Sequence, residues 1–224
     1  MIRLHVTAEG QTEQAFVKDV LTCHLANFDV IADARAVLTS KDKRNAVEYR
    51  GGLISYAKAR ADVLTWLKED CHPECRFTTM FDFYALPDDF PSYGESLKKT
   101  DPYEKVRMLE DAMRADINDS RFIPYIQLHE FEALILADPI QLDWEYMEHD
   151  ASIARLAAMV SDKNPELIDG GRESAPSKRI IKEIHGYDKV TAGVSVVGKI
   201  GLDTLRKKCR HFNDWLTGLE KLAE

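Results

Sequence analysis

The side chains best suited to chemistry in this sequence are acids at the ends of two predicted strands. Glu9 follows an alternating apolar stretch at 2–7, and Asp82 lies at the end of an apolar strand predicted at 76–83. Glu13 falls in the first turn of the helix that begins after Glu9. Carboxylates held together in a cleft repel one another, and a divalent cation relieves the repulsion. The spacing therefore predicts a cation site. The alternative is that these acids are solvated and that Glu13 only complements the helix dipole.

A further pair of acids, Glu130 and Glu132, flanks Phe131 directly after a predicted strand at 122–128. One of the two carboxylates can therefore face the same crevice while the other faces away. The alternative interpretation is a helix amino terminus that is simply rich in acids. His129 precedes the pair, and we interpret it as a structural hydrogen-bonding residue and leave it out of the catalytic set.

Basic residues suited to a phosphate occur late in the chain. Lys178 and Arg179 open a short predicted helix at 177–184, and Arg60 lies on the polar side of a predicted helix at 53–68. Arg offers a planar fork and Lys a point charge, so we predict that these residues bind nucleic acid. Ordinary surface charge on amphipathic helices is the alternative.

The predicted elements place the acids at one edge of a sheet. Strand signals alternate with helical patterns through the first 137 residues, as listed here: strands at 2–7, 30–38, 76–83 and 122–128, helices from Thr12 and at 53–68 and 103–117, and a polar loop at 39–45. This alternation predicts an α/β fold with a mostly parallel sheet flanked by helices. In such folds ligands bind at the carboxyl ends of the strands. We expect an α/β core over 1–137 and a helical extension packed on it over 138–224.

Composition narrows the class of protein. The 224 residues are 45% hydrophobic and 30% charged, which is typical of a globular protein, and no apolar run reaches membrane-spanning length. The four cysteines form no recognisable disulfide framework, so we expect a cytoplasmic protein without a secretory signal. The net charge of −8 argues against a surface that coats nucleic acid broadly.

Charge is distributed unevenly along the chain. Residues 1–160 hold 18 Lys+Arg against 28 Asp+Glu, a balance of −10, whereas residues 161–224 hold 12 against 10, a balance of +2. We therefore expect local contact with nucleic acid that depends on metal ions or on a basic partner.

The segment 71–75 (CHPEC) has a spacing that occurs in zinc sites. A second ligand pair would have to come from the distant Cys209 and His211, or from Cys23 and His24. Structural zinc is therefore the less favoured interpretation of this segment.

Glu9 to Glu13, followed by Asp82 at a strand end, resembles Toprim domains, which bind magnesium through a Glu after the first strand and an Asp-x-Asp after a later one. Four blocks then resemble one bacterial family of unknown function, the DUF4276 type, often encoded beside an ABC- or AAA-type ATPase. The blocks are 79–87 (TMFDFYALP), 129–134 (HEFEAL), 175–179 (APSKR) and 201–215, which runs from Gly-Leu to Phe-Asn-Asp-Trp.

This resemblance implies a Toprim/Rossmann-like sheet and a Mg²⁺- or Mn²⁺-dependent nuclease, with DNA favoured over RNA. It also implies that the chain is the nuclease component of an ATPase-linked anti-phage defence system. Glu9 and Asp82 would be metal ligands, and Glu13 a second ligand or the group that orients water. Of the remaining residues, Glu130 and Glu132 would be further metal ligands, and Lys178 would steady the scissile phosphate.

One position departs from the Toprim pattern, because the second acid would fall at Tyr84. Either the metal has one carboxylate fewer, or Glu130, Glu132 or Asp88 replaces it. The departure favours a second hypothesis, a catalytically inactive Toprim-like subunit that binds nucleic acid or nucleotide and regulates an ATPase. A purely structural partner is the third, and self-association stays open.

Overall fold

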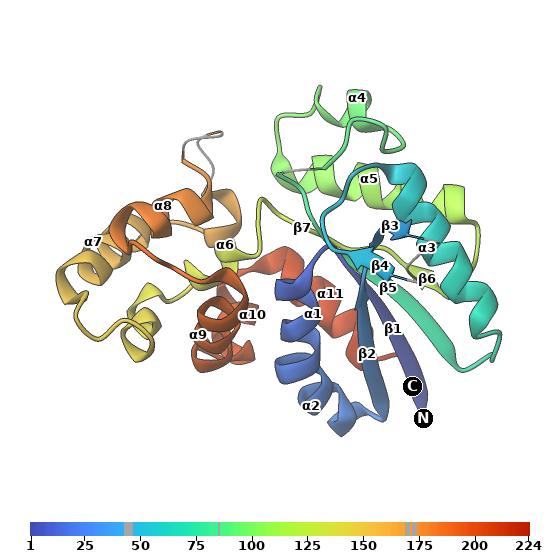
Figure 1. The fold of residues 1–224 in the computed structure, drawn as a ribbon, viewed down its shortest axis with the longest axis horizontal. Helices are drawn as coiled ribbons and strands as arrows, with labels where there is room; N and C mark the ends of the chain where they lie inside the picture. Colours follow the sequence, from blue (N-terminus) through green and yellow to red (C-terminus); the bar gives the residue numbers. More distant parts are fainter. Residues whose placement is uncertain (43–46, 85, 169–170, 172–173) are drawn as a thin grey trace. The chain divides into compact units, whose positions relative to one another are not determined.

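The structure is a computed structural model, and it describes residues 1–42, 47–84, 86–168, 171 and 174–224. The chain divides into two compact units, shown in Figure 1. Unit 1 comprises Met1–Ile126 and Gly218–Glu224, and unit 2 comprises Gln127–Thr217. The division therefore falls before the expected boundary at residue 137, because the segment that contains α6 (Glu132–Ile135) packs with α8 and α9 of unit 2.

Unit 1 is built on a sheet that is mostly parallel, as predicted. In the described residues its strand order is β2 (Val30–Ala36), β1 (Ile2–Ala8), β5 (Cys75–Asp82) and β6 (Phe122–Ile123), and β7 (Ile126–Gln127) also pairs with β5. β1 pairs in parallel with both β2 and β5, and β5 pairs in parallel with β6. Together with its flanking helices, the sheet confirms the predicted α/β class.

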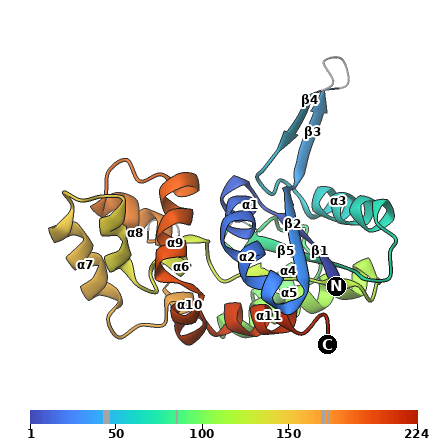
Figure 2. The same cartoon turned by 90° about the horizontal axis from the view of Figure 1, so that it is seen from below.

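Both faces of the central strand β1 are covered. Leu4 and Val6 are fully buried on one face, and His5 and Thr7 are buried on the other, as parallel sheets require. Figure 2 shows helices on either side of the strands. Figure 1 shows α1 (Gln11–Phe16) and α2 (Thr22–Leu25), which are joined by η1 (Val17–Leu21) and followed by η2 (Ala26–Phe28), on one side, and α3 (Tyr56–Glu69) and α5 (Pro102–Ile117) on the other. The short α4 (Tyr93–Ser96) lies between β5 and α5 in the chain.

The start of α5 follows signals that are visible in the sequence. Asp101 accepts a hydrogen bond from the Tyr103 amide at 3.0 Å, and Pro102 occupies the first turn. The sequence predicts that Val106, Leu109 and Met113 face inward from the helix at 103–117, and all three are buried. The helical period of three and four residues therefore predicted the packed face correctly.

The prediction of a polar loop at 39–45 is wrong for the part that the structure describes. β3 (Leu38–Asp42) and β4 (Val47–Arg50) form an antiparallel hairpin, and residues 43–46 lie outside the described residues. The segment lacks the apolar alternation that identifies a half-buried strand. Its strands are defined by backbone pairing, which leaves no pattern in the side-chain sequence.

Unit 2 is helical in the residues that are described. After α6 it contains η3 (Pro139–Trp144), α7 (Asp150–Val160), η4 (Pro165–Leu167), α8 (Pro176–Glu183), η5 (Lys189–Gly193), α9 (Val194–Ile200), α10 (Leu202–Lys208) and most of α11 (Arg210–Glu220). Glu166 is fully buried and accepts hydrogen bonds from the His211 and Phe212 amides, both at 2.9 Å. Its carboxylate thereby satisfies two amides at the start of α11. Within the described residues, no helix is both long and apolar enough to cross a membrane.

Candidate functional site

Glu9 and Asp82 come together at the carboxyl ends of β1 and β5. The strands are in register up to Ala8 and Met80, and the Glu9 amide donates to the Met80 carbonyl at 2.9 Å. The Asp82 amide in turn donates to Glu9 Oε2 at 2.9 Å. Two acids that are 73 positions apart in sequence are therefore adjacent in the fold.

Glu13 lies in the same turn and makes the contact expected of a capping carboxylate. The Gly10 amide donates to Glu13 Oε2 at 2.8 Å, and the residue is only 5% exposed. This hydrogen bond is half of a capping box and stabilises the start of α1. Because Gly10 directly follows Glu9, the same bond keeps the Glu13 carboxylate beside the Glu9 turn. A structural role for Glu13 is thus established, and a chemical role stays a prediction.

A glycine pair fixes the backbone of Glu9 from the other side. The Gly52 amide donates to the Glu9 carbonyl at 2.9 Å, directly after the β3–β4 hairpin. Gly51 and Gly52 have φ values of +101° and +80°, which residues with a Cβ rarely adopt. Substitution of either glycine would therefore strain the loop that supports the acidic turn. From the sequence, Gly51 and Gly52 are expected only to precede the predicted helix at 53–68, and their contact with Glu9 is not predicted.

The carboxylates of Glu9, Glu13 and Asp82 offer oxygen donors at this turn, a donor set that suits a hard cation such as Mg²⁺. Position 84, where Toprim domains carry a second acid, holds Tyr84 with 37% exposure. Asp88 lies exposed on the following loop, and its neighbour Asp89 accepts the Tyr56 amide at 2.8 Å at the start of α3. The residues present therefore fit one Mg²⁺ held by Glu9 and Asp82 better than they fit a two-metal arrangement.

Glu130 and Glu132 belong to unit 2, whereas Glu9 and Asp82 belong to unit 1. Glu130 Oε2 accepts the Ser177 amide at 2.9 Å. Glu132 is fully buried and pairs with Lys189, whose Nζ lies 3.1 Å from its carboxylate. Burial raises the pKa of Glu132, and the charge of Lys189 opposes that rise. Both acids therefore have structural partners within their own unit.

A left-handed turn at His129 precedes Glu130 and Glu132. The residue is buried and has a φ of +64°, a left-handed conformation that His adopts more readily than most residues. The turn at His129 separates the strand predicted at 122–128 from α6. The helix therefore does not begin directly after the strand, contrary to what the sequence suggested. No sequence pattern identified this turn.

The three predicted basic residues differ in how they are held. Lys178 is exposed, whereas Arg179 donates through Nε to the Ser174 carbonyl at 2.6 Å. Arg60 pairs with Asp116 at 2.6 Å, which offsets its charge. A surface hollow in unit 2 gathers several of the basic side chains, with Arg155, Lys178, Arg179, Lys182 and Glu183 among its lining residues.

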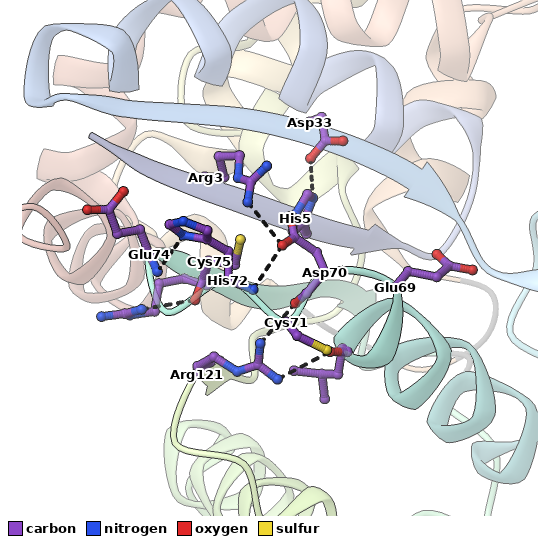
Figure 3. A network of polar contacts seen from close by, with 12 residues as sticks. Arg3, His5, Asp33, Glu69, Asp70, Cys71, His72, Glu74, Cys75 and Arg121 are labelled. Atoms are coloured by element: carbon purple, nitrogen blue, oxygen red, sulfur yellow. Dashed lines mark hydrogen bonds and ion pairs between the residues drawn. The ribbon is translucent and has the colours of Figure 1, made fainter.

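Unit 1 also contains a group of side chains that the sequence analysis did not identify. His5, Asp70 and Cys75, here called the His5 cluster, place a nitrogen, an oxygen and a sulfur within 4.8 Å of one another. Figure 3 shows them between β1, the end of α3 and the start of β5. Two signals pointed there: a histidine inside an otherwise apolar strand, and the segment 71–75.

Of the segment 71–75, the His5 cluster includes Cys75 but not Cys71, and it includes neither Cys23 nor His24. Cys71 Sγ is directed to the Lys68 carbonyl at 3.2 Å. His24 pairs with Glu220 at 2.7 Å, and Cys23 is exposed. Cys209 is buried in unit 2, and its burial raises its pKa well above the ordinary value. All four cysteines are free thiols.

The fold and the acidic turn define an α/β protein with oxygen donors at the carboxyl ends of adjacent parallel strands. The model of a family described as a domain of unknown function, DUF4276, matches residues 8–220. Because the match covers nearly the whole chain, this protein belongs to the DUF4276 family. Among curated proteins and among solved structures, nothing matches the chain.

Proposed function

We propose that this protein is a Toprim-like nuclease that uses Mg²⁺ or Mn²⁺ to hydrolyse phosphodiester bonds, with DNA favoured over RNA. One observation carries the proposal: the Asp82 amide donates to the Glu9 carboxylate at 2.9 Å, which joins two acids at the carboxyl ends of β1 and β5. Ligands of α/β sheets bind at this edge.

The residues of the chain have distinct tasks in this proposal. Glu9 and Asp82 would hold the cation, and the Asp82 amide positions the Glu9 carboxylate by donating to Oε2. Glu13, fixed by the Gly10 amide, would orient the attacking water. When bound, Mg²⁺ would polarise the phosphate and make a bound water more acidic.

The basic hollow of unit 2 supports a nucleic-acid substrate. Lys178 is exposed there, and Lys182 and Arg155 line the same hollow. A Lys ammonium attracts a phosphate as a point charge, so the hollow offers a place for the backbone of a nucleic acid. The balance of +2 after residue 160, against −10 before it, agrees with this assignment.

Tyr84 favours a second candidate function. A phenol in place of a carboxylate weakens the cation site, and an inactive subunit would keep the fold without the chemistry. In that case the protein would bind nucleic acid or nucleotide and regulate an ATPase. The resemblance of the four sequence blocks supports an ABC- or AAA-type partner and an anti-phage role for either candidate, and the cysteine pattern supports a cytoplasmic location.

Cleavage of single- and double-stranded DNA and RNA by the purified chain tests the proposal, with Mg²⁺, Mn²⁺ or chelator and with or without the ATPase encoded nearby. Glu9→Gln and Asp82→Asn should abolish cleavage. Asp111→Asn is the matched control, because Asp111 is an exposed acid on α5 that pairs with Arg114. Metal-dependent cleavage that survives in both site variants contradicts the nuclease assignment. Nucleic-acid binding without cleavage in the wild type favours the regulatory subunit.

A further inference from the structure

The His5 cluster lies at the end of the sheet opposite to the acidic turn. Cys75 is the first residue of β5 and Asp82 is the last, so the two places are about 23 Å apart along the strand. A ligand of the His5 cluster therefore cannot contact the proposed nuclease site directly. Any function of this cluster is separate from phosphodiester cleavage.

Strand register and a tight turn bring the three side chains together. Arg3 pairs with Cys75 and His5 with Phe77, and alternation along the strands places all four side chains on the face that α3 covers. α3 ends at Glu69, and the amide of the next residue, Asp70, donates to the Trp66 carbonyl at 3.0 Å. The chain then turns back to β5, and the Cys75 amide donates to the His72 carbonyl at 3.0 Å.

The histidine ring is held in one orientation. Its Nδ1 lies 2.7 Å from Asp33 Oδ1, and its Nε2 lies 3.0 Å from Asp70 Oδ2. The rings of Trp66 and Phe77 pack on it with centroids at 4.7 and 5.0 Å. A carboxylate on one nitrogen, with the other nitrogen directed to a donor set, is the arrangement that orients histidine ligands in metal sites.

The Asp70 carboxylate divides its two oxygens between different partners. Oδ1 accepts Arg3 at 3.0 Å and the His72 amide at 3.1 Å, which leaves Oδ2 on the side of His5. A cation could therefore take Oδ2 while Arg3, whose side chain is 49% exposed, keeps its place on Oδ1. Cys75 is fully buried beside Asp70 and supplies the sulfur.

We propose that His5, Asp70 and Cys75 form a zinc-type metal site at the amino end of β5. A thiolate together with an imidazole selects a borderline-soft transition metal over Mg²⁺ or Ca²⁺. Tetrahedral zinc with these ligands has donor atoms about 3.3–3.8 Å apart, so donors now within 4.8 Å need only small side-chain movements. Water or a further ligand would occupy the fourth position.

Without metal, protons and ion pairs satisfy the same groups. Burial lowers the pKa of His5, but its hydrogen bonds to Asp33 and Asp70 raise the pKa by more, so the net shift is upward. The hydrogen bond from the Cys75 thiol, followed by that from His5, holds the pKa of Asp70 well below its ordinary range. Metal binding would replace the protons of His5 Nε2 and Cys75, which is the usual exchange at such sites.

Cobalt binding tests the proposal on the full-length chain after treatment with chelator. Titration with Co²⁺ should give a thiolate-to-cobalt charge-transfer band, together with the strong visible bands of a tetrahedral ion, and these bands should saturate at one such ion per chain whether or not the acidic turn also binds Co²⁺. Zn²⁺ should then displace Co²⁺, and excess Mg²⁺ should not. At 100 times its dissociation constant, Zn²⁺ should raise the melting temperature by roughly 5–10 °C.

Matched variants separate the site from its surroundings. Cys75→Ser should abolish the charge-transfer band, and Cys71→Ser, in the neighbouring exposed thiol, should leave it unchanged. Asp33→Asn should keep the band and weaken affinity about 10–100-fold, because Asp33 acts by positioning the ring. His5→Gln provides a second ligand variant if Cys75→Ser does not fold. Absence of the band in the wild type, or its survival in Cys75→Ser, overturns the proposal and leaves a network of ion pairs.

Discussion

The two ends of β5 use the same strand in opposite ways. At the carboxyl end, the carboxylates of the acidic turn are supported by backbone amides: Glu9 accepts the Asp82 amide and Glu13 accepts the Gly10 amide. At the amino end, His5, Asp70 and Cys75 bring together a nitrogen, an oxygen and a sulfur atom, and other side chains hold them in place. Backbone amides stabilise the carboxylates of the acidic turn without neutralising their charge. In the His5 cluster, ion-pair partners such as Arg3 already balance the charge of Asp70. The acidic end therefore needs a cation more than the His5 cluster does.

The comparison predicts that the largest effect on activity comes from the carboxyl end. Glu9→Gln or Asp82→Asn should lower cleavage at least about 100-fold, since each removes a ligand charge and keeps the shape. Melting temperature should stay the same or rise without metal, because crowded carboxylates are relieved. A steady-state cleavage assay and a thermal melt measure the two effects. A large loss of stability in either variant would remove the contrast between the two ends.

The amino end should show the opposite behaviour. Asp70→Asn should lower the free energy of unfolding by roughly 2–3 kcal/mol in chelator, because Asp70 accepts hydrogen bonds from the Arg3 and His5 side chains. Urea denaturation measures the change, and cleavage by the folded fraction should stay at the wild-type level. Glu74→Gln is the control, as Glu74 is an exposed acid in the adjoining turn. Equal stability of Asp70→Asn and the control would show that the cluster contributes little to the fold.

A third prediction concerns the substrate rather than the metal. Lys178→Ala with Arg179→Ala should weaken nucleic-acid binding and flatten its salt dependence by roughly one to two counterions. Metal binding at both ends of β5 should be unaffected. Lys98→Ala, in an exposed residue that pairs with Glu95, is the control. A salt slope equal to that of the wild type would identify Lys178 and Arg179 as ordinary surface charge.

The smallest predicted effect concerns Arg60. The hydrogen bond from Tyr56, followed by that from Arg60, lowers the pKa of Asp116 below its ordinary value of 3.8. Because the folded pKa is depressed, this contribution to stability is present above pH 3.8 and is lost as pH falls through the folded pKa. Asp116→Asn should therefore cost at most about 1 kcal/mol at neutral pH, given that these side chains are partly solvated, and less in acid.

Urea denaturation of the wild type and Asp116→Asn across pH measures this difference. Convergence of the two free energies in acid supports the assignment. A constant difference would show that Asp116 acts through packing. If Arg60 binds nucleic acid, the variant should also bind more tightly, since the variant frees the guanidinium from its partner.

Several features of this fold could be predicted from the sequence because they depend on local periodicity. Apolar alternation identified β1, an apolar stretch identified β5, and a three-to-four-residue period identified the buried stripe of α5. Since an acid next to a strand end must lie at the edge of the sheet, Glu9 and Asp82 could be placed there as well. Parallel pairing of adjacent strands then made their convergence predictable.

Other features depended on contacts between distant segments, which local patterns do not record. The β3–β4 hairpin is defined by backbone pairing, and the left-handed turn at His129 by its surroundings. Glu166 is buried because it satisfies the amides that open α11, 45 and 46 positions further on. Burial of a carboxylate costs free energy unless its hydrogen-bonding partners are present, and these partners come from a distant segment.

The His5 cluster shows most clearly what the sequence alone could not predict. His5 and the segment 71–75 were visible in the sequence, but the partners considered for the cysteines were other Cys and His residues. Whether His5 lies beside Asp70 or Cys75 depends on the register of β1 against β5 and on where α3 ends. A shift of one residue in that register would move His5 to the opposite face of the sheet. The sequence determined the donors, and only the tertiary structure decided which of them meet.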